Sequence, residues 1–249
     1  MTLEMGTTLL TFSGKLGDIL WCLPAARALH RQGWTVDFAT MPAYAAVHEL
    51  MAAQPYLRRA FALPGWQQVD DHCGARPRLP PSVPNGYAKA AHLTYERRPT
   101  YPLVEHALRV LRLPLEAAAG PFLEPAPRAD APARLVAYAF TGEAPEAKAR
   151  VLHRLRQGLP AGTQFADVGK LPFLEAAIVI ASARFFLGCR SANWVVAQGV
   201  GARCLICEPN TGRREPIFGN PYGSPEVMPP PGDVEAFVHT ALRWLGDGA

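Results

Sequence analysis

The feature that most constrains the fold is an alternation of short apolar runs with helical periodicity, which stops at a proline-rich segment and then restarts. Before that segment, the pattern predicts strands at 7–12, 36–39, 59–63 and 88–93, and helices at 19–29, 42–51 and 103–111. After it, the pattern predicts strands at 135–140, 164–168, 184–187 and 202–207, and helices at 147–159, 173–181, 191–199 and 233–245. Strands that alternate with helices are typical of parallel sheets covered by helices, so the chain belongs to the α/β class.

The interruption lies at 114–132, which holds five prolines and little periodicity. We interpret it as a linker between two Rossmann-like domains, 1–120 and 121–249, with the last helix packing near the hinge or back on the N-terminal domain. Open parallel sheets bind ligands at the carboxyl ends of their strands. The expected site is therefore a cleft between the two domains.

Composition excludes several classes of protein. The net charge of +4 is spread along the chain without a basic block, so nucleic-acid binding is not required. No apolar run approaches a membrane span, and the first residues lack the basic start of a signal peptide. Five cysteines form an odd and sparse set, which favours a reducing compartment, and we expect a cytoplasmic location.

Metal sites are weakly indicated. Residues 70–73 (Asp-Asp-His-Cys) are of ligand type, but no second cluster follows at zinc-finger spacing. Cys204 and Cys207 lie three apart within a predicted strand, where their side chains point to opposite faces. We expect no metal and no cofactor.

The first candidate site is the loop 13–18 (Ser-Gly-Lys-Leu-Gly-Asp), between a strand and a helix. It matches neither a Walker A loop nor a dinucleotide fingerprint. Its glycines make a tight turn at Gly14 and Gly17, around Lys15, and present Asp18 at a helix start. Asp18 is then either a helix cap or a general base, and the residues alone leave both open.

The second candidate site is the stretch 188–194, also between a strand and a helix. Backbone N–H groups at Ser191, Ala192 and Asn193, with Arg190 beside them, are suited to a pyrophosphate, although Ser191 is equally suited to capping the helix. A third candidate region follows the last strand of the pattern and comprises Glu208, Asn210, Thr211 and Arg213.

Residues 13–29 resemble the opening of the ADP-heptose:lipopolysaccharide heptosyltransferases, glycosyltransferase family nine. In that family a small-residue loop is followed by Gly-Asp, apolar residues, Leu-Pro-Ala and an Ala/Leu-rich helix, as here from Ser13 through Pro24 to Leu29. The resemblance implies the GT-B fold, in which two Rossmann-like domains face each other across a cleft, and metal-independent chemistry. It also implies that Asp18 is the catalytic base.

A second stretch, 174–188 with Ser191 and Ala197, resembles the family's donor region. The family's D-[ST]-G motif and histidine are changed here to Arg190, Ala192 and Val195, while Ser191 is retained. The chain is also shorter than typical members. We expect a donor, or a mode of donor binding, that differs from that of ADP-heptose.

Taken together, these features predict an inverting, metal-independent glycosyltransferase that uses a nucleotide-diphosphate sugar as co-substrate. The N-terminal domain would bind a glycan, lipid-linked or modified-nucleic-acid acceptor, and the C-terminal domain the donor. One alternative is a glycosyltransferase for modified bases of phage DNA, with a groove from Tyr95, Arg97, Arg98 and Tyr101. Another is a nucleotide-sugar-binding protein that has lost turnover.

Overall fold

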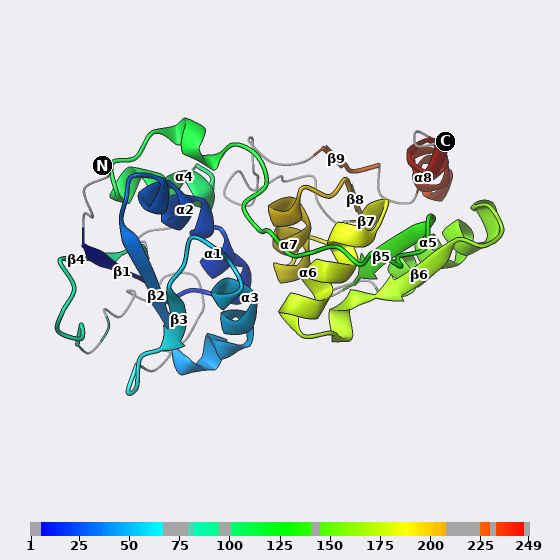
Figure 1. The fold of residues 1–249 in the computed structure, drawn as a ribbon. Coiled ribbons are helices and arrows are strands. Elements are labelled where there is room, and N and C mark those ends of the chain that lie inside the picture. Colours follow the sequence, from blue (N-terminus) through cyan, green and yellow to red (C-terminus); the bar gives the residue numbers. More distant parts are fainter. Residues whose placement is uncertain are drawn as a thin grey trace. The chain divides into compact units, whose positions relative to one another are not determined.

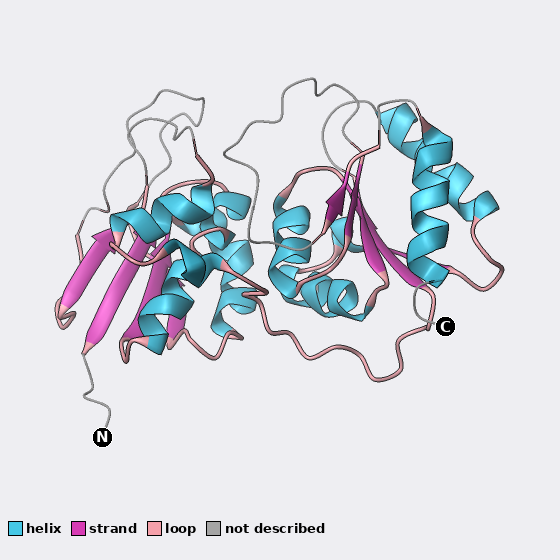
Figure 2. Ribbon diagram, turned by 90° about the horizontal axis from the view of Figure 1, so that it is seen from above, coloured by secondary structure: helices cyan, strands magenta, loops and turns pink. Residues whose placement is uncertain are grey.

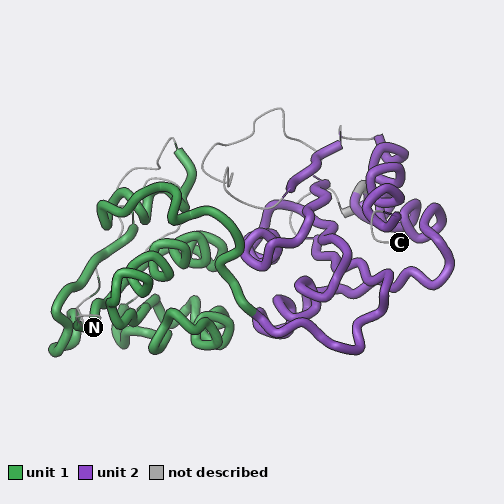
Figure 3. The backbone as a smooth tube through the Cα atoms, turned by 45° about the horizontal axis from the view of Figure 1, so that its top comes forward, with its two compact units in different colours: residues 1–124, 215–222 green, residues 125–214, 223–249 purple. Residues whose placement is uncertain are grey.

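A computed structural model describes residues 6–66, 80, 82–94, 101–140, 145–207, 225–229 and 233–246. The described chain divides into two compact units (Figure 3), and the boundary between them lies between Glu124 and Pro125. Each unit has a parallel sheet of its own, as the alternating pattern predicts.

The sheet of unit 1 has the strand order β3-β2-β1-β4, and all neighbouring strands are parallel (Figure 1). Its strands are β1 (Thr7–Phe12), β2 (Thr35–Thr40), β3 (Arg59–Ala62) and β4 (Lys89–His92). The helices are α1 (Leu16–Leu20), α2 (Leu23–Arg31), α3 (His48–Ala52) and α4 (Leu103–Val110), with 3-10 helices at Pro42–Val47 and Leu115–Ala118.

The helix predicted over 19–29 is two helices. α1 ends at Leu20, and α2 begins at Leu23 with Pro24 in its first turn. Proline is tolerated there because the first N–H groups of a helix have no partner within the helix. The break after α1 thus explains a proline that would be costly inside one continuous helix.

The first part of the predicted linker is packed structure. Ala118, Phe122 and Leu123 are buried in unit 1. The Arg27 guanidinium of α2 donates to the carbonyls of Ala117, Ala119 and Pro121. We name residues 117–124 the strap. The prolines around its apolar side chains interrupt any helical or strand periodicity, so the sequence pattern did not indicate packing there. The linker interpretation is wrong for this segment.

A buried carboxylate fastens the amino-terminal half of the unit 1 sheet. Asp37 of β2 is fully buried and accepts hydrogen bonds from Arg58, Arg59 and Tyr87 at 2.6–2.8 Å. Burial alone would raise the pKa of Asp37, but the hydrogen bonds outweigh it and hold the pKa below its ordinary value. This cluster joins β2, β3 and the segment before β4 near the amino ends of the strands, whereas the candidate loop lies at their carboxyl ends.

The sheet of unit 2 has the strand order β6-β5-β7-β8-β9, again with parallel neighbours. Its strands are β5 (Leu135–Ala139), β6 (Gln164–Asp167), β7 (Phe185–Gly188), β8 (Cys204–Ile206) and β9 (Glu226–Val227). The helices are α5 (Pro145–Gly158), α6 (Phe173–Ser182), α7 (Ala192–Val200) and α8 (Val234–Gly246), with a 3-10 turn at Val168–Lys170. The sheet lies between α6 and α7 on one face and α5 and α8 on the other (Figure 2). The short β9 falls in a stretch interpreted from the sequence as a loop.

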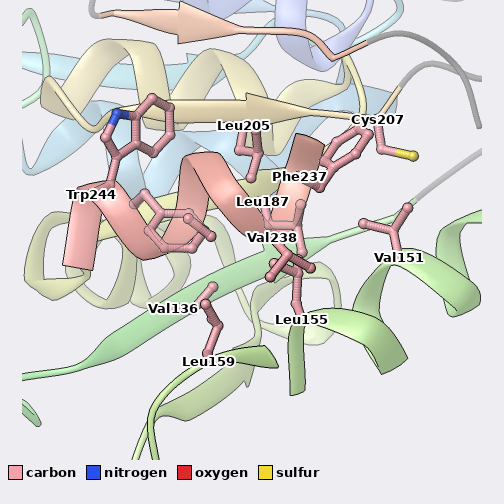
Figure 4. Close-up of a cluster of buried hydrophobic side chains, with 12 residues drawn as sticks. Val136, Val151, Leu155, Leu159, Leu187, Leu205, Cys207, Phe237, Val238 and Trp244 are labelled. Carbon is pink, nitrogen blue, oxygen red and sulfur yellow. The ribbon is translucent and has the colours of Figure 1, made fainter. Parts of the chain in front are cut away.

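The last helix completes the core of unit 2. α8 buries Phe237, Val238, Ala241 and Trp244 against α5 and strands β5, β7 and β8 (Figure 4). Its apolar face is therefore used within unit 2. Among the described helices, none combines the length and the apolar composition needed to cross a membrane.

Candidate functional site

Each sheet contains one point at which the order of its strands reverses. In unit 1 the reversal lies between β1 and β4, and in unit 2 between β5 and β7. The connections that leave adjacent strands at such a point run in opposite directions, which opens a crevice beyond the carboxyl ends of the strands. Both candidate loops from the sequence follow a strand of a reversal pair: 13–18 follows β1, and 188–194 includes the end of β7.

The unit 1 loop is fastened across its reversal point. The backbone N–H of Ser13 donates to Oγ1 of Thr94 at 2.8 Å, and the two hydroxyl oxygens lie 2.9 Å apart. Thr94 follows the last paired residues of β4, so this clasp joins the carboxyl ends of β1 and β4. It fixes the start of the segment that carries Asp18.

Asp18 is the third residue of α1 and lies in its first turn, partly buried. The capping position belongs to Lys15, whose side chain makes no capping hydrogen bond. Asp18 is therefore not the helix cap that the sequence allowed, although the positive end of the helix still favours its negative charge. Burial raises the pKa of the Cys22 thiol, and the Asp18 carboxylate raises it further, which places the carboxylate near Cys22.

Among the other residues of this loop, Gly14 is the one that the turn requires. A side chain at Gly14 would collide with the Phe12 ring, so the backbone needs glycine there. Lys15 is exposed just before α1, and Gly17 lies within that helix. The structure thus brings Gly14, Lys15, Gly17 and Asp18 together in one strand-to-helix connection.

A second polar pair lies on the same two strands, two residues before Ser13 and Thr94. Nδ1 of His92 lies 2.8 Å from Oγ1 of Thr11, and the His92 ring packs against Trp66 with centroids 5.8 Å apart. Burial lowers the pKa of His92 to about 4, so the imidazole is neutral at pH 7. The pairs Thr11–His92 and Ser13–Thr94 thus link β1 and β4 by polar contacts directly before the candidate loop.

In unit 2 the carboxyl ends of β5 and β7 approach so closely that Gly188 admits no side chain. A Cβ there would lie 2.6 Å from the Ala139 carbonyl oxygen and 2.6 Å from Cζ of Phe186. The Gly188 carbonyl also accepts the N–H of Cys207 at 2.7 Å, which draws the end of β8 to the same edge. The 188–194 loop therefore begins at a closely packed point of the sheet.

The start of α7 presents polar groups that the described residues do not satisfy. Ser191 occupies the capping position, but its side chain makes no capping hydrogen bond. Within the described residues, the buried atoms Oγ of Ser191 and Oδ1 of Asn193 have no hydrogen-bond partner. The Ser191 hydroxyl and the first N–H groups of the helix, near Ala192, are donors suited to an anionic oxygen-rich ligand, whereas Oδ1 of Asn193 is an acceptor suited to a hydroxyl or N–H group.

Arg190 is engaged with a residue that the sequence did not single out. Its Nη2 lies 2.7 Å from Oε1 of Glu226, at the start of β9, and its guanidinium lies 5.4 Å from the Trp194 ring centroid. The Trp194 indole N–H donates to Oε2 of the same carboxylate at 2.8 Å. We name Arg190, Trp194 and Glu226 the anchor cluster.

Several predicted residues lie outside the described part of the chain. These are Glu208, Asn210, Thr211 and Arg213 of the third candidate region, residues 70–73, and Tyr95, Arg97 and Arg98. Tyr101 is described. Its ring stacks on His106 with the two ring centroids 6.3 Å apart, and Cζ of Arg109 lies 4.9 Å from the centroid of the Tyr101 ring. In the described residues no three His, Cys, Asp or Glu side chains gather as a metal site would require.

Two residues of these sites were missed from the sequence. Thr94 has a usable signal, because it directly follows a predicted strand and so lies at the carboxyl edge of the sheet. Glu226 has none, because it lies 36 positions from Arg190 in a segment whose proline content predicts a loop. Only the pairing of β9 with β8 brings Glu226 to the start of α7.

No protein-family model and no curated protein matches the sequence. A glycosyltransferase family 9 protein from Veillonella parvula superimposes with a TM-score of 0.63 at 12% identity, over 96% of this chain and 90% of that one.

Two further solved structures come from Escherichia coli. Heptosyltransferase WaaC with ADP gives a TM-score of 0.60 at 12% identity, over 98% of this chain and 100% of that one. ADP-heptose lps heptosyltransferase II gives a TM-score of 0.54 at 12% identity, over 95% of this chain and 98% of that one. The predicted fold class is confirmed: the chain has the two-sheet α/β fold, of the GT-B type, that these glycosyltransferases share.

Proposed function

We propose that the protein is a glycosyltransferase that moves a sugar from a nucleotide-diphosphate sugar to an acceptor hydroxyl, with inversion at the anomeric carbon. The observation that carries the proposal is a carboxylate, Asp18, in the strand-to-helix connection at the reversal point of a fold shared with heptosyltransferases. Fold alone admits many functions, so the chemistry rests on these residues.

The donor is assigned to unit 2. The WaaC structure was solved with ADP, which is a nucleoside diphosphate. At the start of α7, the backbone N–H groups and the Ser191 hydroxyl, which has no partner among the described residues, supply the donors. The positive end of the helix then stabilises the negative charge that develops on the departing diphosphate. This arrangement provides for leaving-group charge without a metal ion.

The acceptor is assigned to unit 1. The Asp18 carboxylate takes the proton of the acceptor hydroxyl as its oxygen attacks the anomeric carbon and the bond from that carbon to the diphosphate breaks. The clasp between Ser13 and Thr94 holds the loop at the correct end of β1. A general base must be both placed and unprotonated, and the loop provides the placement.

The test is Asp18→Asn, which keeps the size of the side chain and removes its basicity. We expect donor affinity and melting temperature close to wild type and turnover lower by about 10²–10⁴, the usual contribution of a general base. Glu116→Gln, which neutralises a carboxylate in the first turn of another helix, is the control. Turnover is followed after a thermal-shift screen of nucleotide-diphosphate sugars identifies the donor.

Wild-type turnover in Asp18→Asn would place the base elsewhere. A strong loss of melting temperature would make Asp18 chiefly structural. A wild-type protein that binds donors but transfers no sugar to any acceptor would support the alternative of a binding protein.

A further inference from the structure

The anchor cluster contains the Arg190 guanidinium, which we predicted from the sequence to contact the donor phosphates. Arg190 lies next to the ligand-directed residue Ser191, and a guanidinium there is an obvious candidate for a phosphate contact. Its Nη2, however, makes an ion pair with Glu226 at 2.7 Å, with only 15% and 20% of the two side chains exposed. A guanidinium held this way is already neutralised by a nearby carboxylate.

Glu226 also holds α7 itself. Its second oxygen accepts the indole N–H of Trp194, a buried residue in the first turn of α7. One carboxylate therefore ties the loop before the helix, through Arg190, to the first turn of the helix, through Trp194. These are the two segments whose relative placement determines where the N–H groups of residues 191–193 point.

We propose that Arg190 is a positioning residue and not a phosphate ligand: it acts through Glu226 to orient the start of α7. This inference rests on the proposed donor site and concerns how that site is built. The diphosphate is met by the Ser191 hydroxyl, whose Oγ has no hydrogen-bond partner within the described residues, and by the first N–H groups of the helix. Glu226 becomes a determinant of donor binding that makes no donor contact.

The two roles of Arg190 predict opposite effects when Glu226 is neutralised. Glu226→Gln keeps an oxygen that accepts the Trp194 N–H but removes the charge that holds Arg190. If Arg190 were a phosphate ligand, the change would release its charge and leave binding equal or tighter. If Arg190 is a positioning residue, the change loosens the start of α7 and weakens binding.

The experiment is a double-mutant cycle of Arg190→Gln and Glu226→Gln, read by calorimetric titration with inorganic pyrophosphate and with ADP, and by melting temperature. We expect each single variant to bind the diphosphates about tenfold more weakly than wild type, within the usual range for interacting residues. The double variant should bind no more weakly than either single one. The exposed pair of Arg154 and Glu235, also in unit 2, supplies the matched control variants Arg154→Gln and Glu235→Gln, which should bind as wild type.

The remaining outcomes overturn the inference. Unchanged or tighter binding in Glu226→Gln, or a further loss when Arg190→Gln is added to it, makes Arg190 a direct ligand. A lower melting temperature with wild-type affinity makes the cluster purely structural. A wild-type protein that binds neither pyrophosphate nor ADP, nor any other nucleoside diphosphate, contradicts the donor site itself and this inference with it, so the two failures are distinguishable.

Discussion

The Arg27 guanidinium offers the most direct test of how unit 1 is held together. Arg27 is 5% exposed and donates to three backbone carbonyls of the strap, at 2.9 Å to Ala119, 3.3 Å to Ala117 and more closely to Pro121. Burial is the main reason that its pKa is lowered from the ordinary value. The burial of Arg27 thus carries a desolvation cost, which these hydrogen bonds and the nearby Tyr56 and Glu124 offset.

We expect Arg27→Met to lower the free energy of unfolding by about 2–4 kcal/mol. Two well-formed hydrogen bonds from a charged donor contribute about 1.5–3 kcal/mol each. Methionine regains part of this sum because the cost of burying a charge disappears. The carbonyls of Ala119 and Pro121 belong to exposed residues and can bind water once released, which limits the loss further. For a chain of this length, each kcal/mol lowers the melting temperature by about 2–4 °C, or about 5–15 °C in all.

The assay is urea unfolding followed by circular dichroism, with amide hydrogen exchange of the strap as a local measure. Arg31→Met, an exposed position one turn later on α2, is the control and should change stability by less than about 0.5 kcal/mol. Arg27→Lys should fall between the two, because an ammonium group does not span carbonyls on three residues. Equal stability of Arg27→Met and Arg31→Met, with unchanged exchange in the strap, would refute the reasoning.

Two further predictions concern the sheet edges. Burial sets the pKa of His92 to about 4, against about 6.5 in an unfolded chain, so the unfolded chain binds more protons between these values and stability falls as the pH is lowered through that window. This difference in pKa bounds the loss at about 3 kcal/mol, and solvent screening of the partly exposed ring reduces it to about 1–2 kcal/mol. His92→Gln should flatten the slope in urea unfolding between pH 7 and 4, whereas His30→Gln, at an exposed position, should not. Gly188→Ala should cost about 1–3 kcal/mol, because its Cβ would meet the Ala139 carbonyl oxygen and the Phe186 ring at 2.6 Å. Gly246→Ala, with open space around the new Cβ, is the control, and thermal melts that show the same change for both glycines would contradict the packing argument.

The sequence by itself determined the α/β class, the restart of the pattern after the prolines, and the position of Asp18 between a strand and a helix. These features are local: the period of the apolar residues distinguishes strand from helix, and glycine and proline mark the turns. The same local signals failed where apolar residues were few among prolines. The strap was interpreted as a linker, although Phe122 and Leu123 are buried in unit 1.

Only the tertiary structure decided which distant residues meet. The order of the strands places Thr94 beside Ser13, 81 positions away, and pairs β9 with β8 so that Glu226 reaches Arg190. Strand order depends on which apolar faces are covered by which helices, and the local patterns of a single sequence do not predict that order. The charge of Arg190 was visible in the sequence, but whether that charge faces a ligand or a carboxylate depends on the folded neighbour, because a buried ion pair forms only where the chain brings both partners together.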